Sequence, residues 1–285
     1  MYILSVILVL ASGISHAVWN LLAKRSDNKS LFLFVIFVPA TIMLLPTTIA
    51  DILKPGIPPQ GFLLLVLSLL IQGGYAFFLS RAYMYGDMSH AYPMMRGVSA
   101  FLLPVASMLL FDETLSVWGW LGLALIAGGF SATSGLNVQR RKKTIPLKVV
   151  LLTLGVGLCT MSYVLVDKAN LRYFSPIVLL EVSNIGFMMG LAPFVRFREI
   201  DWKREWKNHR WVLAAGSILS PGSYLLFLFA MKLAPLTYVA PLREIGTVFG
   251  TAAAIYLLKE KKEIVRMVSA CVIFAGILIV GIWGM

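Results

Sequence analysis

About ten apolar runs, each roughly 20 residues long, occupy this chain of 285 residues almost from end to end. A helix needs about 20 apolar residues to cross the hydrocarbon core of a bilayer, so each run predicts a membrane-spanning helix. We expect these helices over 2–23, 31–50, 61–80, 90–111, 117–135, 147–167, 174–195, 211–231, 235–257 and 264–284. The gaps between the runs are short, which leaves almost no sequence for a soluble domain.

Composition indicates the same class of protein. Hydrophobic residues make up 59% of the chain and charged residues 13%, against roughly 45–50% and ~25% in a soluble domain. These values exclude an ordinary soluble enzyme, a disordered chain and a disulfide-rich scaffold. The net charge of +12 does not indicate nucleic-acid binding, because the basic residues gather in the short gaps between apolar runs. The expected partner is therefore the lipid bilayer, with no nucleic acid.

Matched residues indicate that the ten spans form two repeats of five. Arg96 precedes Glu113 by 17 positions, and Arg243 precedes Glu260 by the same 17 positions. A glycine, an aromatic residue and a lysine recur in the first spans of the two halves, at Gly13, Trp19 and Lys24 and again at Gly157, Tyr163 and Lys168. An odd number of spans per half places the halves in opposite orientations. Secondary transporters commonly have such inverted repeats, with the substrate site near the membrane midplane.

The predicted fold is an all-α polytopic membrane protein with ten transmembrane helices in two inverted five-helix repeats. The repeats cover 1–137 and 147–285, and a basic linker, 138–146, joins them. Of the 25 Lys and Arg residues, 19 lie in or beside the odd-numbered connections and 4 lie in the even-numbered ones. The positive-inside rule then places the odd-numbered connections in the cytoplasm and both termini outside. We expect a multi-pass protein of a bacterial-type inner membrane.

Five stretches of the sequence resemble the EamA family of the drug/metabolite transporter superfamily. They are HAVWNLLAK (16–24), RAYMYGDMSHAYPMMRG (81–97), FDETLSVWGWLGLALIAGG (111–129), APLTYVAPLREIGTVFG (234–250) and LLKEKKEIV (257–265). The first-half stretches look closest to the subgroup of phosphonate-utilisation-associated membrane proteins. The resemblance implies the drug/metabolite transporter fold and a transporter rather than an enzyme. It also implies cytoplasmic termini, opposite to the orientation from the basic residues, so the orientation stays open at this point.

Ionisable residues inside the predicted spans are the strongest functional signal. Arg96, Arg243, Glu181 and Glu244 all lie within apolar runs, where a charge costs a few kcal/mol or more and therefore faces the interior or a cavity. Arg96 and Arg243 occupy equivalent repeat positions, which predicts that both face a shared cleft. Two interpretations remain open. Either an arginine binds a carboxylate, phosphate or phosphonate of the substrate, or the arginines join helices by pairing with Glu181 and Glu244.

Other polar and aromatic residues complete the candidate site. The further residues predicted to bind substrate are Trp19, Asn20, Tyr75, Tyr92, Tyr163, Tyr224 and Asn184. Aromatic residues also serve as packing residues or interface anchors, and both interpretations remain open for them. For coupling to protons or cations we expect Glu181 first and Glu244 second. His16 is a third candidate because histidine titrates near neutral pH, and a neutral His16 bonded to another helix is the alternative.

The expected function is secondary active transport, as exporter or importer, of a small polar metabolite that is anionic or zwitterionic, by alternating access. No GxxxxGK[ST] motif occurs, so coupling is to protons, to exchange, or absent. The alternative is a flippase for a lipid-linked headgroup of the polyprenyl-phosphate type. A membrane-embedded enzyme is a weaker interpretation, because the three histidines lie on separate segments and no HExxH motif occurs. We expect no cofactor, no metal site and a functional monomer.

Overall fold

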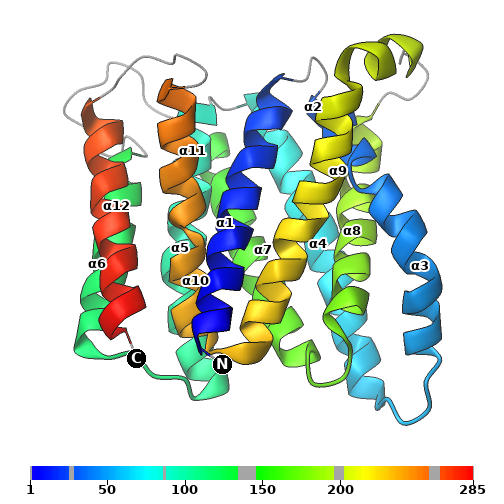
Figure 1. Cartoon of the computed structure of the whole chain (residues 1–285), viewed down its shortest axis with the longest axis horizontal. Helices are drawn as coiled ribbons and strands as arrows, with labels where there is room; N and C mark the ends of the chain where they lie inside the picture. The colour runs from blue at the N-terminus through cyan, green and yellow to red at the C-terminus, as the bar shows by residue number, and fades with distance from the viewer. Residues whose placement is uncertain are drawn as a thin grey trace.

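The computed structural model describes residues 2–25, 29–85, 88–133, 146–195, 202–256 and 264–284 of the chain. All regular elements in these ranges are helices, and most of them run side by side in one bundle (Figure 1). Of the predicted basic linker 138–146, all but Pro146 lies outside the described residues. The prediction of an all-α protein is therefore confirmed for the part of the chain that the structure describes.

The helices follow the apolar runs. They are α1 (Tyr2–Arg25), α2 (Lys29–Val35), α3 (Val38–Ile52), α4 (Pro59–Tyr85), α5 (Met88–Phe111), α6 (Val117–Thr133), α7 (Leu147–Asn170), α8 (Pro176–Leu191), the short 3-10 helix η1 (Ala192–Phe194), α9 (Trp202–Leu233), α10 (Leu236–Arg243), α11 (Ile245–Tyr256) and α12 (Ile264–Trp283). Within the described ranges, eight helical segments are long and apolar enough to cross a membrane, and α6 is a shorter apolar helix of 17 residues. The short helices α10 and α11 together occupy the remaining predicted span. The predicted class, a polytopic helical membrane protein, is confirmed.

One span that was expected to be continuous is a broken helix. The expected span 31–50 divides at Ile36 and Phe37, between α2 and α3. Pro39 lies in the first turn of α3, a position that suits proline because the first N–H groups of a helix have no intrahelical acceptor. The hydropathy of this run gave no sign of the break, because the residues on both sides of it are apolar.

A second break divides the expected span 235–257 at Glu244, between α10 and α11. Pro241 lies inside α10 and cannot donate a backbone hydrogen bond, which weakens the turn before the break. α1 lies directly against this point, because an added Cβ on Gly13 would be only 2.8 Å from the carbonyl oxygen of Arg243. Glycine permits this close approach of two membrane helices. The break is therefore held in the interior of the bundle.

Helices from distant parts of the chain pack against one another. α1 contacts α9 and α11, α7 contacts α4 and α5, and α6 contacts α12. Figure 1 shows the α6–α12 pair at one edge of the bundle. This pair meets backbone to backbone, since an added Cβ on Gly122 would be 2.7 Å from the carbonyl oxygen of Gly276. Small residues commonly make such contacts between membrane helices.

The outer surface of the bundle is apolar, whereas its interior holds polar side chains. Leu109, Val117 and Ile218 are largely exposed, and Asp167 and Glu181 are fully buried. An apolar outer surface and buried charged groups are both unusual for a soluble protein. It fits a bundle surrounded by lipid, in which charged groups face inward to find partners or water.

Both chain ends lie at the same end of the bundle, as an even number of spans requires (Figure 1). The connections 53–58, 112–116 and 171–175 also lie at this end. They are three of the even-numbered connections, which carry few basic residues. In the orientation predicted from the basic residues this is the outer end, and that orientation stays a prediction.

Candidate functional site

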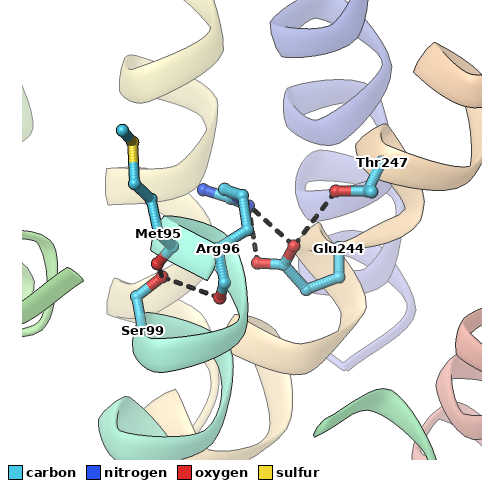
Figure 2. Close-up of polar contacts among 5 residues, drawn as sticks. All are labelled: Met95, Arg96, Ser99, Glu244 and Thr247. Atoms are coloured by element: carbon cyan, nitrogen blue, oxygen red, sulfur yellow. Dashed lines mark hydrogen bonds and ion pairs between the residues drawn. The ribbon is translucent and has the colours of Figure 1, made fainter. Parts of the chain in front are cut away.

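Arg96 and Glu244 form an ion pair that joins α5 to the break between α10 and α11 (Figure 2). Nη2 of Arg96 lies 2.5 Å from Oε1 of Glu244, and Nε donates to Oε2 at 3.2 Å. Only 14% of the Arg96 side chain and 5% of the Glu244 side chain are exposed. Two such hydrogen bonds match the fork of a guanidinium to a carboxylate and fix the orientation of both groups. In this conformation Arg96 therefore joins helices, as the second interpretation of the arginines predicts.

Two hydroxyl groups lie near the pair, and one of them bonds to it (Figure 2). Oγ1 of Thr247 on α11 donates to Oε2 of Glu244 at 3.3 Å. Oγ of Ser99 on α5 donates to the carbonyl oxygens of Met95 and Arg96, at 3.3 and 3.1 Å. The Ser99 bonds stay within one helix, as serine hydroxyls inside helices commonly do. Direct support for the ion pair therefore comes from α11.

Arg243, the residue before Glu244, has different neighbours. Adjacent helical residues point about 100° apart, and the guanidinium carbon of Arg243 lies 4.3 Å from the ring centre of Phe227 and 5.7 Å from that of Tyr224, both on α9. The residue is 7% exposed, and its Nε has no hydrogen-bond partner among the described residues. Aromatic faces attract the cation but accept no conventional hydrogen bond from it. Arg243 therefore keeps donor capacity for an anion.

The two arginines and Glu244 line the same small cavity. Its volume is about 20 Å³, and its walls come from α5, α7, α9, α10 and the break after α10. A space of this size holds about one water molecule. The shared cleft predicted for Arg96 and Arg243 is thus present in this conformation only as a narrow space.

Three of the predicted tyrosines lie in a row that ends beside Arg243. Tyr75 on α4 contacts Tyr163 on α7 edge to face, with ring centres 5.7 Å apart. Tyr163 contacts Tyr224 on α9 in the same way at 5.8 Å. Edge-to-face pairs of this kind add to the stability of a core, so these rings pack the interior beside Arg243. The structure brings this part of the predicted site together.

The predicted site residues of α1 have other surroundings. Trp19 is buried in an apolar cluster with Phe32 and Ile36, and its Nε1 has no hydrogen-bond partner within the described ranges. His16 contacts the Trp19 ring edge to face at 5.1 Å. Nδ2 of Asn20 donates to the carbonyl oxygen of His16 at 2.7 Å, so the Asn20 amide bonds to its own helix.

A larger cavity lies on the other side of Thr247. Its volume is about 120 Å³, and its walls come from α1, α5, α6, α11 and α12. Its polar lining includes Asn20, Thr247 and Arg266. Thr247 lines this cavity and also donates to Glu244, which lines the small cavity. The hydrogen bond between Thr247 and Glu244 therefore runs from one cavity to the other.

Glu181 and Asn184 lie on α8 and line neither of these two cavities. Both residues are buried, and the two carboxyl oxygens of Glu181 and Nδ2 of Asn184 have no hydrogen-bond partner in the part of the chain that the structure describes. The ion pair with Arg96 uses Glu244, and Glu181 takes no part in it. The backbone of Tyr92 lies in α5, and its side chain lies outside the described part of the structure.

Asp167 is a buried carboxyl that the sequence interpretation missed. The expected span 147–167 ends at this residue, and Lys168 follows, a pattern typical of a membrane–water boundary. α7 instead continues to Asn170, and Asp167 is 0% exposed. A signal was present, because Asp167 lies four residues after the candidate Tyr163 and therefore on the same helix face.

Glu113 is a second carboxyl whose role was not predicted. Its oxygens accept hydrogen bonds from the backbone N–H groups of Leu236 at 2.8 Å and Thr237 at 2.7 Å, at the start of α10. Oγ of Ser107 also donates to it at 2.8 Å. Pro235 precedes α10 and provides no side-chain cap, so a carboxylate from another segment satisfies these N–H groups and interacts favourably with the helix dipole.

Lys168 joins the same region from α7. Its Nζ donates to the carbonyl oxygens of Met231 at 2.6 Å and Ala234 at 3.1 Å, at the end of α9. The same Nζ lies 3.8 Å from Oε1 of Glu113. A cation near the last carbonyl groups of a helix is favourable. Glu113 and Lys168 thus hold together the end of α9 and the start of α10.

The fold and these buried charges define a class: a multi-pass helical membrane protein with an ion pair and an arginine at the junction of its helices. Comparison with known families agrees. Residues 147–282 match the EamA-like transporter family, and this segment contains Arg243 and Glu244. The match covers just under half of the chain, and it shows that this segment is similar to a family of membrane transporters. No curated protein matches the chain.

Solved structures share the fold. Matches to this chain include 28 chains of known structure. One of them, a crystal structure described only as that of a protein, is 14% identical, with a TM-score of 0.74. The alignment covers 97% of this chain and 94% of that chain. The likeness therefore extends over nearly the whole bundle and concerns the fold.

Proposed function

We propose that this protein is a secondary active transporter that binds the anionic group of a small polar metabolite at Arg243 and moves it by alternating access. The observation that carries the proposal is the state of Arg243. A charge buried among membrane helices is costly, and the Nε of this one has no acceptor among the described residues. A carboxylate, phosphate or phosphonate would supply both the opposite charge and the missing acceptors.

In this proposal the Arg96–Glu244 pair closes the site. The small cavity of about 20 Å³ is far below the roughly 300–1,000 Å³ of small-molecule sites, so binding requires the surrounding helices to separate. Moving α5 away from the α10–α11 break would part Arg96 from Glu244. The larger cavity beside Thr247 is then the adjoining space from which a substrate reaches both arginines.

Helix contacts support the proposal that 1–137 and 147–285 are inverted repeats. In such a repeat α1 corresponds to α7, and α9 and α11 correspond to α4 and α5. The contacts of α1 with α9 and α11 then have counterparts in those of α7 with α4 and α5. Added Cβ atoms on Gly13 and Gly157 would meet the carbonyl oxygens of Arg243 at 2.8 Å and Met95 at 3.1 Å. Repeats related in this way open a shared site alternately to the two sides.

The proposal includes the cellular setting and the substrate class. The distribution of basic residues supports an inner-membrane protein with its odd-numbered connections in the cytoplasm. The resemblance of the first-half motifs to phosphonate-associated membrane proteins makes aminophosphonates the first substrates to test. Because such compounds are zwitterionic or anionic, they fit a site built around Arg243. Protons are the proposed coupling ions, and the monomer is the proposed functional unit.

Exchange of labelled compounds across liposomes tests this function. Purified protein in defined liposomes is assayed with amino acids, aminophosphonates and phosphorylated metabolites, loaded inside and supplied outside. We expect exchange of at least one anionic compound by the wild type and none by Arg243→Ala. Arg243→Lys should retain part of the activity, because it keeps the charge and loses the fork. Lys232→Ala, at an exposed basic residue of α9, serves as the control, and normal exchange by Arg243→Ala contradicts the proposal.

The same vesicles distinguish the flippase alternative. A flippase would move a polyprenyl-phosphate lipid between leaflets, and Arg243→Ala would abolish that movement. Exchange of a water-soluble anion in vesicles without this lipid supports the transporter. Lipid movement without any exchange of soluble compounds supports the flippase, in which case Arg243 holds the lipid phosphate.

A further inference from the structure

One carboxyl in the interior is held by hydroxyl groups from two other helices. Oγ of Ser68 on α4 donates to Oδ1 of Asp167 at 2.6 Å, and the phenol of Tyr224 on α9 donates to Oδ2 at 2.5 Å. Asp167 is 0% exposed and forms no ion pair among the described residues. Lys168, the next residue, turns away to the end of α9. The carboxyl is therefore buried in the bundle, near the end of α7, with neutral hydrogen-bond partners.

The helices packed against α7 carry further polar and charged groups. α9 contributes Tyr224, whose ring lies 5.7 Å from the Arg243 guanidinium carbon. α7 itself contributes Tyr163, in edge contact with Tyr224, and α4 contributes Ser68 and Tyr75. On α5, Arg96 lines the small cavity together with Thr160 and Val164, which lie about two turns and one turn before Asp167 on α7. Tyr224 is thus the link between the carboxyl and Arg243.

A phenol has a single O–H group, so Tyr224 can donate to one acceptor at a time. An ionised Asp167 accepts this hydrogen bond. A protonated Asp167 carries an O–H of its own, which frees the phenol to turn its O–H toward an anion held by Arg243. The proton comes from water and leaves to water, so the step needs no other reactant. One proton on Asp167 and one anion at Arg243 favour each other's binding in this arrangement, which is the condition for coupling.

We propose that Asp167 is the carboxylate that carries the coupling proton of this transporter, and that Tyr224 connects its protonation to anion binding at Arg243. This inference rests on the proposed transport function and assigns the coupling site to a residue other than Glu181, Glu244 or His16. Ionisable groups buried among membrane helices commonly mark proton pathways. A buried carboxyl can bind the coupling proton in one step of transport and release it in the next.

Infrared spectroscopy of the protein in liposomes tests the proton site without any substrate. A protonated carboxyl has a C=O stretching band that the carboxylate lacks. As pH is raised from about 5 to 9, across the range of protonation changes near neutrality, we expect one such band to disappear in the wild type. Asp167→Asn should lack this titrating band, and the matched variant Glu181→Gln should keep it. A band that survives in Asp167→Asn, or the absence of any titrating band, overturns the assignment whatever the transport assay shows.

Two tyrosine variants test the link. Tyr224→Phe removes the donor that stabilises the carboxylate, so it should move the midpoint of the Asp167 band to higher pH by about one unit, a tenfold change in proton affinity. Tyr163→Phe keeps the adjacent ring and should leave the midpoint unchanged. Ser68→Ala should act in the same direction as Tyr224→Phe and serves if that variant does not fold. Unchanged midpoints in both donor variants overturn the link.

Transport by Asp167→Asn then separates coupling from substrate binding. With the compound found in the exchange assay, we expect this variant to keep exchange and to lose accumulation driven by a pH gradient. Loss of exchange as well, in a variant that still inserts and folds, overturns the coupling role, because Asp167 would then act on the substrate or on the fold itself. Failure of the wild type to exchange any compound contradicts the transport function and leaves the infrared result standing by itself.

Discussion

Two neighbouring residues, Arg243 and Glu244, direct opposite charges to different helices. Glu244 lies at the break after α10 and reaches Arg96 on α5, whereas Arg243 turns toward the aromatic rings of α9. Glu244 therefore has an ion-pair partner in the protein. The Nε of Arg243 has no hydrogen-bond acceptor within the described ranges. Because the two residues are adjacent in the chain, their different partners follow from the different directions of their side chains.

A double-mutant cycle measures the Arg96–Glu244 pair. Glu244→Gln leaves a buried cation without its counter-charge and should lower the free energy of unfolding by roughly 3–5 kcal/mol. Arg96→Met combined with Glu244→Gln removes both charges and should be less destabilised than Glu244→Gln alone. Unfolding in mixed detergent micelles gives the free energies of the wild type, of the single variants Glu244→Gln and Arg96→Met, and of the double variant. If the loss of unfolding free energy in the double variant equals the sum of the losses in the two single variants, the two side chains do not interact.

For single residues, the sequence identified most of the buried charged side chains but did not predict which of them form pairs. Arg96, Arg243 and Glu244 were found because a charge inside an apolar run must face the interior. Their pairing depends on the rotation of α5 relative to the α10–α11 break, which the order of residues does not contain. Asp167 was missed because the apolar run ends there, although the helix and the burial continue to Asn170.

Single elements also depend on groups far away in the chain. The start of α10 has no cap of its own, and Glu113 accepts its first N–H groups. Glu113→Ala should cost about 1–2 kcal/mol, and Glu113→Gln should cost less because one amide oxygen still accepts. Hydrogen exchange at the amides of Leu236 and Thr237 should become faster in the alanine variant. Unchanged exchange at both amides contradicts a capping role.

The contact between α1 and the helix break gives a second prediction for an element. An added Cβ on Gly246 would clash with the backbone carbonyl of Gly13. Gly246→Ala should therefore lower the thermal unfolding midpoint, despite the intrinsic gain of about 1 kcal/mol from alanine in a helix. Gly222 on α9 has no atom within 4 Å of an added Cβ among those described, so Gly222→Ala is the control and should be neutral or stabilising. A drop of equal size in both variants contradicts the close contact.

Helix positions were predictable because apolar runs of membrane length have one structural solution in lipid. The breaks at Ile36–Phe37 and at Glu244 were not, because hydropathy does not change across them. Pro39 and Pro241 indicate where a helix is weak, and many membrane helices tolerate a proline without breaking. The contacts with neighbouring helices decide which proline accompanies a break.

For the whole molecule, orientation in the membrane is the main open prediction. We expect the connection at Lys54, at the same end as both termini, to face outward (Figure 1). In a background with Cys159 and Cys271 replaced by serine, Lys54→Cys should react with a membrane-impermeant maleimide in intact cells. Lys148→Cys, at the start of α7, should react only after the membrane is opened. The reverse pattern would establish cytoplasmic termini, as the family resemblance implies.

The edge formed by α6 and α12 affects how the protein fits its membrane. Gly122 of α6 and Gly276 of α12 bring the two helix backbones into direct contact, so neither helix can slide along the other without loss of this packing. A change in bilayer thickness must therefore be met by both helices together or by the lipid beside them. Hydrophobic mismatch should make the protein sensitive to acyl-chain length.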